Sequence, residues 1–189
     1  MEIINSKLIG TGACIPDFVL TNAMLEKMVD TNDEWIVQRT GVRERRIAKN
    51  THTWELALGA AQDALADAGI TAEKLDLILV STCSPDTNTP NTASILQDKL
   101  GARQVGAFDI NNACTGFVSA TDIADSYIKS GKAKTVLVVS AETLSRIVDY
   151  TDRSTCILFG DGAAAAVYQA TEDETAGILS TFTAADGSG

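Results

Sequence analysis

The stretch Asp109-Ile-Asn-Asn-Ala-Cys-Thr-Gly-Phe117 places Cys114 between two apolar segments of different character. The run from Val105 to Ile110 predicts a buried strand, and the run from Phe117 to Ile128 predicts a helix. A thiol at such a strand-to-helix turn faces the free N–H groups and the positive end of the helix dipole, which favour the thiolate. The residues alone leave two alternatives, a buried inert thiol and a nucleophile that accepts an acyl group.

The helix after Cys114 is predicted to be buried on all sides. Apolar residues cover most of its circumference in the first half, at Phe117, Val118, Ala120, Ile123 and Ala124. A helix that is apolar all round belongs in the interior of a protein rather than on its surface. The sequence therefore predicts a buried helix that begins at the thiol.

Strands and helices alternate along the rest of the chain. Further strands are predicted at Ile3 to Gly12, Leu75 to Ser81, Thr135 to Val139, Ala163 to Tyr168 and Gly177 to Phe182. Further helices are predicted at Ala23 to Val29, Trp54 to Ala68, and after the loop Ser84 to Asn91 as far as Leu100. Residues 31–50 are predicted to be a polar loop with at most a helical turn. This alternation predicts an α/β fold, with a mostly parallel sheet covered by helices on both faces. No linker divides residues 1–189, so a single domain is expected.

The overall charge argues against several functions. The chain carries 25 acidic and 15 basic residues and a net charge of −10, whereas sequence-independent nucleic-acid binding needs a basic face. Its four cysteines form no Cys-x-x-Cys pair, so no metal site is expected. Neither a signal peptide nor an apolar run of membrane-spanning length is present in the sequence, which predicts a cytoplasmic location with reduced thiols and no membrane partner.

Two local patterns each have two interpretations. The arginines at positions 39, 43, 45 and 46 form either a solvated basic turn or a phosphate-binding edge. The segment Gly160-Asp-Gly-Ala-Ala-Ala165 matches a dinucleotide-binding fingerprint, but the sequence after it is too short for a complete βαβ unit. The favoured interpretation is structural: small residues let this segment pass close behind the turn that holds the cysteine.

Several motifs occur together in a characteristic order. They are Thr21-Asn22, Leu25 to Thr31, Asp33 to Ile36, Arg39 to Arg45, Ala113 to Phe117, Thr151 to Arg153, Phe159 to Ala163 and Ala185 to Ser188. With these motifs the chain resembles the β-ketoacyl-ACP synthase III family of the thiolase superfamily along its whole length. The resemblance implies the N-terminal half of a thiolase-like fold, with the helix after Cys114 as its buried nucleophile helix.

The resemblance also implies a reaction. Cys114 is expected to be acylated by an acyl-CoA, with acetyl-CoA as the expected primer, and then condensed with malonyl-ACP in a decarboxylative Claisen reaction that starts fatty-acid synthesis. The backbone N–H of Cys114 is expected to form half of an oxyanion hole. CoA thioester is then a substrate, no tightly bound cofactor is expected, and the enzyme is expected to be a homodimer.

The resemblance places CoA beside an indole and two guanidinium groups. Trp35 and Arg153 are expected to stack on the adenine, Arg39 to lie near the phosphates, and Thr31 to belong to the same pocket; flat rings and guanidinium forks suit these groups. The structural alternatives are an aromatic packed against a helix end for Trp35 and a surface ion pair for Arg153.

Two departures from the family pattern limit what the resemblance implies. The relatives are nearly twice as long, and their catalytic histidine and asparagine are expected in the other half, so this chain alone is expected not to condense substrates. The only histidine, His52, is assigned no catalysis. Thr89 stands where some relatives place phenylalanine, in a loop expected to reach the partner's acyl channel. Two alternatives stay open: a non-condensing module that binds acyl-CoA or transfers the acyl group, and another thiolase-superfamily enzyme that uses CoA thioesters.

Overall fold

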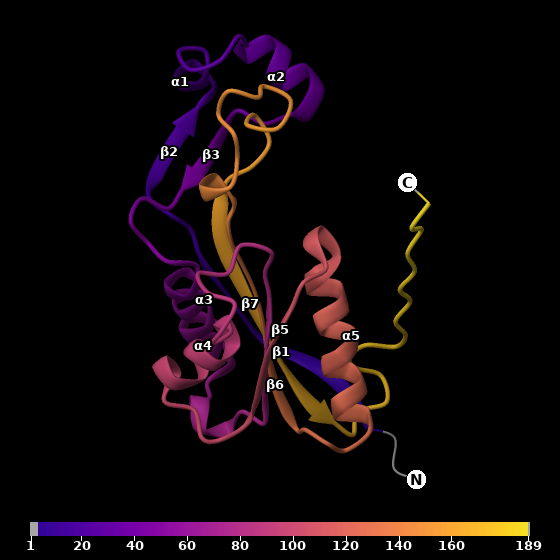
Figure 1. The fold of residues 1–189 in the computed structure, drawn as a ribbon. Helices are drawn as coiled ribbons and strands as arrows, with labels where there is room; N and C mark the ends of the chain where they lie inside the picture. Colours follow the sequence, from indigo (N-terminus) through magenta and orange to yellow (C-terminus); the bar gives the residue numbers. More distant parts are fainter. Residues whose placement is uncertain (1–3, 189) are drawn as a thin grey trace.

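The computed structural model describes residues 4–188 and is built around a five-stranded sheet in the order β1-β7-β6-β4-β5 (Figure 1). The strands are β1 (Asn5–Cys14), β4 (Leu77–Ser81), β5 (Gly106–Ile110), β6 (Thr135–Thr143) and β7 (Asp161–Thr171). β4 is parallel to β5 and β6, whereas β7 is antiparallel to both of its neighbours, β1 and β6. All strands except β7 therefore point the same way, which confirms the predicted α/β fold with a mostly parallel, mixed sheet.

Helices cover both faces of this sheet. Helices α3 (Thr53–Ala68) and α4 (Thr92–Leu100) pack on one face, where Ile78 and Val80 of β4 point. Helix α5 (Gly116–Lys129) packs on the other face, against Leu77 and Leu79. Successive side chains of a strand point to opposite faces, so every residue of β4 is buried and its sequence is continuously apolar up to Ser81.

Helix α3 lies unusually close to β1 along a seam of small residues. A Cβ added to Gly12 would lie 2.3 Å from Ala64 N, and one added to Gly10 would lie 2.5 Å from Ala64 O. The facing side of the helix is made of alanines, which are fully buried at positions 57, 60, 61 and 64. Backbone therefore packs directly on backbone at this seam, which we call the small-residue seam.

A second, smaller layer of structure has its own apolar core. It contains β2 (Phe18–Thr21), α1 (Asn22–Leu25), α2 (Asp33–Thr40) and β3 (Glu44–Ile47), where β2 and β3 pair antiparallel. Residues 148–157 pack against these elements and add Cys156 and Ile157 to their core. We call residues 18–47 with residues 148–157 the hairpin module. Figure 1 shows it beyond the end of the sheet at which α5 begins.

The prediction that residues 31–50 form a polar loop is wrong, because α2 and β3 occur there. Asn32 accepts a hydrogen bond from Trp35 N (2.8 Å), and Gly41 ends α2 with φ 73°. These are ordinary helix-start and helix-end signals. The following strand, Glu-Arg-Arg-Ile, is polar because it packs in the small module rather than in the main core.

Other expectations also differ from the structure. Residues 177–182, predicted as a strand, form none. Ile178 N donates to Ser6 O (3.0 Å), but this single bond is not continued into a ladder of strand pairing. Helix α1 ends at Leu25 rather than at Val29, and Ile3 lies outside the described residues. The fingerprint at Gly160 opens strand β7 instead of a helix, which rules out the dinucleotide-binding interpretation.

The expected burial of α5 on all sides is not reached. Its inner face is fully buried at Ala120, Ala124 and Ile128, whereas Val118 on the outer face is 54% exposed. The reason is that the described residues place a layer on only one side of this helix. The apolar outer face explains why the sequence pattern indicated complete burial.

Candidate active site

Cys114 lies at the end of the sheet where the parallel strands finish. It belongs to a short 3₁₀ helix (Ala113–Thr115) between β5 and α5, and its residue is exposed. Ala113 has φ 43°, in the left-handed region, which turns the chain sharply between strand and helix. Because β4, β5 and β6 are parallel, their carboxyl ends meet at this edge, as in other open α/β sheets that bind ligands there. The thiol is therefore at the start of a 14-residue helix and open to a ligand.

The start of α5 is pressed against the end of β4. A Cβ on Gly116 would lie 1.9 Å from Ser81 Oγ, so only glycine fits without displacing that side chain. Thr82 N donates to Ile110 O (3.1 Å), which extends the contact between the two strands by one residue. The position of Cys114 is thus tied to the exit of β4.

The other three thiols are less accessible than Cys114. Cys14 and Cys83 are half-buried and Cys156 is buried. Burial raises the pKa of each thiol, and the nearby carboxylates of Asp17, Glu142 and Asp152 raise the pKa of Cys14, Cys83 and Cys156 further. A raised pKa leaves less thiolate at neutral pH. Exposure and position single out Cys114 among the four.

The residues predicted to bind CoA come together in the hairpin module. The guanidinium carbon of Arg39 lies 4.3 Å, and that of Arg153 5.1 Å, from the ring centroid of Trp35. Both are within the range of cation–π attraction. Arg153 also donates to Asp30 O (3.1 Å), which holds its guanidinium beside the indole. A base stacked on that face of the ring would have to displace it.

Thr31 lies one residue beyond Asp30 in the same loop. Its hydroxyl oxygen is shielded from solvent and has no hydrogen-bond partner among residues 4–188. A shielded, unpaired hydroxyl is costly unless something bonds to it. Thr31, Trp35 and both arginines are thus carried by the hairpin module, although the sequence separates Trp35 and Arg153 by more than one hundred residues.

The arginine cluster divides into structural and exposed members. Arg45 is buried, and its guanidinium donates to Asn22 Oδ1 (2.8 Å) and Ile157 O (2.7 Å). Burial lowers the pKa of Arg45, and these acceptors bind both of its terminal nitrogens, so it holds the module together instead of binding phosphate. A Cβ on Gly160 would lie 2.9 Å from Arg46 O, so glycine at this position makes room for β3. The sequence instead predicted that the small residues of this segment make room for the turn that holds Cys114.

Some residues near the site were missed from sequence. Glu142 at the end of β6 accepts a hydrogen bond from Cys83 N (2.9 Å), and Asp86 accepts bonds from Thr53 N (3.1 Å) and Trp54 N (2.9 Å) at the start of α3. His52 Nδ1 lies 3.0 Å from Asp86 Oδ1 and belongs to this cap. The only available signal was a carboxylate placed directly after an apolar strand or in a Pro-rich loop.

The described residues contain no cluster of three His, Cys, Asp or Glu side chains that could hold a metal ion. Within residues 4–188, no helix is both long enough and apolar enough to cross a membrane.

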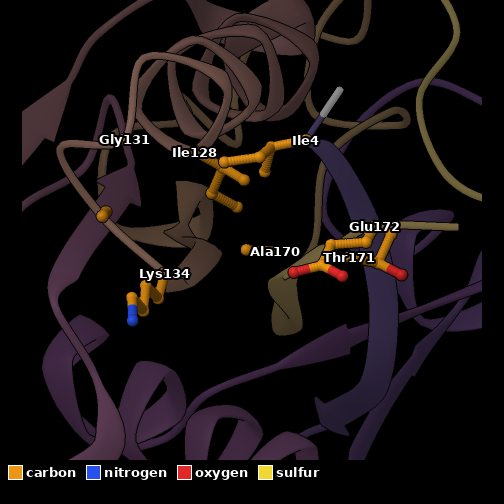
Figure 2. A pocket seen from close by; sticks show the side chains of 8 residues that line it. Ile4, Ile128, Gly131, Lys134, Ala170, Thr171 and Glu172 are labelled. Carbon is orange, nitrogen blue, oxygen red and sulfur yellow. The ribbon is translucent and has the colours of Figure 1, made fainter. Parts of the chain in front are cut away.

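A separate hollow lies at the other end of the sheet (Figure 2). It has a volume of about 330 Å³ and is lined by apolar side chains such as Ile4 and Ile128, with Lys134 and Glu172 at its rim. Ile128 is near the end of α5, whereas Cys114 precedes its start, so this hollow is remote from the thiol. The open surface around Cys114 contributes no residue to it.

Comparison with known proteins gives the context of this geometry. The sequence profile of the family described as 3-Oxoacyl-[acyl-carrier-protein (ACP)] synthase III matches residues 108–187. A protein from Xanthomonas campestris pv. campestris (strain 8004), named Beta-ketoacyl-[acyl-carrier-protein] synthase III, is 56% identical over 186 residues, which are 98% of this chain and 57% of the relative. The chain belongs to the β-ketoacyl-ACP synthase III family.

Solved structures agree with this family assignment. The 3-oxoacyl-[acyl-carrier-protein] synthase III of Aquifex aeolicus VF5 superposes with a TM-score of 0.88 and 56% identity, over 89% of this chain and 55% of that one. The priming β-ketosynthase of the R1128 polyketide pathway also gives 0.88, with 37% identity, over 90% and 52%. This synthase III chain thus spans a little over half the length of the curated relatives it matches, and its fold is the thiolase-like fold predicted.

Proposed function

We propose that this chain forms part of a β-ketoacyl-ACP synthase III that starts fatty-acid synthesis. The observation that carries the proposal is the position of Cys114, the one exposed thiol of the four, at the start of α5 and at the carboxyl end of three parallel strands. In a chain 56% identical to a named synthase III, this position supports a nucleophile that accepts acyl groups.

In the first half-reaction, the Cys114 thiolate attacks the carbonyl of an acyl-CoA, with acetyl-CoA as the proposed primer. The carbonyl carbon forms a bond to sulfur, and the CoA thiolate leaves and takes up a proton. The backbone N–H of Cys114 is assigned as one of the two donors that hydrogen-bond to the oxyanion. The positive end of α5 favours both the attacking thiolate and the developing oxyanion.

In the second half-reaction, malonyl-ACP loses CO₂ and its carbanion attacks the acyl group on Cys114. The new carbon–carbon bond expels the Cys114 thiolate and yields a β-ketoacyl-ACP. We place the histidine and asparagine that assist decarboxylation in the part of the family's length outside this chain, because its only histidine caps α3.

CoA binding is proposed for the hairpin module. The contact of Arg39 and Arg153 with the Trp35 ring supports a site for a flat base and for phosphates, and the unpaired Thr31 hydroxyl supplies a further hydrogen-bonding group. No tightly bound cofactor enters the proposed reaction. A cytoplasmic location is proposed with it, since both thioester substrates are intracellular metabolites.

A homodimer is proposed through the free edge of the sheet. β5 is the last strand of the sheet that residues 4–188 form, and within that sheet it pairs with β4 alone. A free edge of backbone donors and acceptors can pair with another strand. The neighbouring loop Ser84 to Asn91, which carries Thr89, then faces the second copy.

The test is acyl transfer to the complete enzyme, followed by intact-mass measurement. Wild-type protein incubated with acetyl-CoA should gain one acetyl group, and Cys114→Ser should gain none, because a serine hydroxyl is a much weaker nucleophile without a strong base. Cys14→Ser is the matched control and should acylate normally. Acylation of the Cys114→Ser protein at the wild-type rate would refute the assignment.

A second candidate is a priming ketosynthase of another pathway, which the equal TM-score of the polyketide-priming structure favours. The two functions differ in the acyl-CoA and carrier protein that they accept. Acylation rates across acetyl-, butyryl- and branched acyl-CoA thioesters would separate them. An acyl-CoA module that does not condense would acylate but release no ketoacyl product from malonyl-ACP.

A further inference from the structure

One half-buried carboxylate, that of Glu142, bonds to the corner at which β4 leaves the sheet. Glu142 Oε1 accepts a hydrogen bond from Cys83 N (2.9 Å). Its other oxygen accepts bonds from the hydroxyls of Ser84 and, at 3.4 Å, Thr82. The Glu142 side chain, near the end of β6, therefore accepts hydrogen bonds from three consecutive residues that directly follow β4, Thr82 to Ser84.

Ser84 secures the same corner from its other side. Its hydroxyl oxygen accepts a bond from Thr143 N (2.8 Å), and its carbonyl accepts one from Thr53 Oγ1 (2.8 Å). Thr53 Oγ1 in turn lies 2.6 Å from Thr143 Oγ1, and both threonines are fully buried. Buried polar networks of this kind fix one arrangement, because every alternative leaves a donor or acceptor unpaired.

The corner is also the surface against which the nucleophile turn packs. Ser81 contacts Gly116 at the start of α5, and Thr82 N donates to Ile110 O at the end of β5. The Cys83 thiol is close enough to Cys114 for a charge on Cys114 to contribute to the raised pKa of Cys83. A shift of residues 82–84 would therefore be transmitted to the reactive thiol.

We propose that Glu142 is a positioning residue, which holds the corner Thr82–Cys83–Ser84 so that Cys114 keeps its reactive placement. This inference rests on the proposed function of Cys114, but Glu142 touches neither the substrate nor the reacting sulfur in it. It acts through the backbone N–H of Cys83 and through Ser84. Glutamine at position 142 keeps the shape, but its NH₂ group replaces one of two oxygens that both accept bonds, and there it faces a donor, either Cys83 N or the Ser84 hydroxyl.

The experiment compares two variants of the complete enzyme, Glu142→Gln and Asp76→Asn. Asp76 is the matched control because it is likewise a carboxylate that accepts backbone N–H bonds, from Lys134 (2.8 Å) and Thr135 (3.0 Å), but at the opposite end of the sheet. Three quantities are measured: the melting temperature, the rate at which iodoacetamide alkylates Cys114, and kcat and KM for acylation by acetyl-CoA.

Glu142→Gln should lower both the alkylation rate of Cys114 and the acylation kcat by about 10- to 100-fold, since small misplacements of a reacting group cost that much. The KM for acetyl-CoA should change little, because the CoA residues lie in the hairpin module. Asp76→Asn should lower the melting temperature comparably and leave the Cys114 rates unchanged. Ser84→Ala removes the bond from the Ser84 hydroxyl to Glu142 but keeps the bond from Cys83 N. It should lower the same two rates by a smaller factor.

Equal effects of Glu142→Gln and Asp76→Asn on the Cys114 rates would overturn the proposal, as would unchanged rates in Glu142→Gln. If Glu142→Gln does not fold, unchanged alkylation in Ser84→Ala overturns it instead. Alkylation needs no acyl-CoA, so it separates this inference from the proposed function. A wild-type enzyme that is not acylated refutes the function, while the alkylation rates still decide the role of Glu142.

Discussion

At the scale of single residues, the pairing of one indole with two guanidinium groups makes a specific claim about CoA. Trp35→Ala and Arg153→Ala in the complete enzyme should each raise the KM for acyl-CoA by about 5- to 150-fold, as expected for losing about 1–3 kcal/mol of stacking and charge. The KM for malonyl-ACP should rise less, because only the CoA thioester carries the nucleotide.

The second tryptophan offers a matched control for this prediction. Trp54 on α3 also has a cation over its ring, with Lys99 Nζ 5.9 Å from the centroid, but it lies outside the hairpin module. Trp54→Ala should leave both KM values near wild type. Equal increases for acyl-CoA and malonyl-ACP in Trp35→Ala would mean that the ring supports the fold instead of the nucleotide.

Asp86 makes a prediction about pH. Burial raises the pKa of Asp86, but hydrogen bonds from Trp54 N, Arg146 and Thr53 N outweigh burial and hold the pKa below its ordinary value. A lowered folded-state pKa stabilises the fold above the unfolded-state pKa of about 3.9, and this stabilisation disappears as the pH falls through the folded-state value. Asp86→Asn should therefore cost about 0.5–2 kcal/mol of unfolding free energy at pH 7.

That cost should shrink as the pH falls below about 4, because the carboxylate of the unfolded chain takes up a proton there before the native carboxylate does. Denaturant unfolding of both proteins at pH 7 and at the lowest pH at which they stay folded measures the change. Asp98→Asn is the control, since Asp98 is 76% exposed and pairs only with its neighbour Lys99. A cost for Asp86→Asn that does not depend on pH would show that ionisation of Asp86 is irrelevant to stability.

At the scale of elements, the contact between β4 and α5 gives a test with an unambiguous sign. Alanine normally stabilises a helix relative to glycine by about 0.5–1 kcal/mol. Gly116→Ala should instead destabilise the protein by about 1–3 kcal/mol, because the new Cβ meets Ser81 Oγ at 1.9 Å. Adding Ser81→Ala should recover much of the loss, and a stabilised Gly116→Ala protein would contradict the packing.

The elements also show what periodicity predicts and what it misses. β4, β5, β6, α3 and α5 were predicted because their residues are apolar in runs or at helical spacing, and each of them packs in the main core. Helix α2 and strand β3 of the hairpin module escaped prediction, and β3 did so because it buries the arginine at position 45 and has a single apolar residue, Ile47. Residues 177–182 have the composition of a strand, but a strand also needs a neighbour to pair with.

The site divides in the same way. Cys114 was singled out by a strand, a turn and a helix that are contiguous in sequence, and the family resemblance then favoured a nucleophile over an inert thiol. Trp35 and Arg153 were predicted through a family resemblance, since no local pattern joins residues so far apart. Glu142 was missed because its role depends on the parallel register that sets Ser81 beside Ser140, which no sequence window contains.

At the scale of the whole molecule, the outer face of α5 and the last residues leave apolar groups uncovered. Leu179 and Phe182 are 80% and 88% exposed, and Val118 on the outer face of α5 is 54% exposed. Exposed apolar surface of this kind favours association. The 189-residue chain alone should therefore self-associate, and it should release no ketoacyl product from acetyl-CoA and malonyl-ACP.

Light scattering and a product assay test both parts of this prediction. Val118→Ser should reduce self-association, whereas Met24→Ser, at an exposed apolar position of the hairpin module, should reduce it less. Co-expression with the remaining segment of the family's length should restore the product. A monodisperse monomer that makes ketoacyl product at a normal rate would refute the proposed source of the decarboxylating residues.

The small-residue seam between β1 and α3 has a consequence for how this half of the molecule gains its order. Glycine and alanine have no side-chain rotamers to freeze, so the seam forms with almost no loss of side-chain entropy. It equally has no side chain that can swing aside, because a larger group at Gly10 or Gly12 meets backbone atoms of Ala64 and its neighbours. The seam therefore fixes the distance between α3 and β1. Saturation mutagenesis should show that Gly10 and Gly12 tolerate no larger residue, serine included.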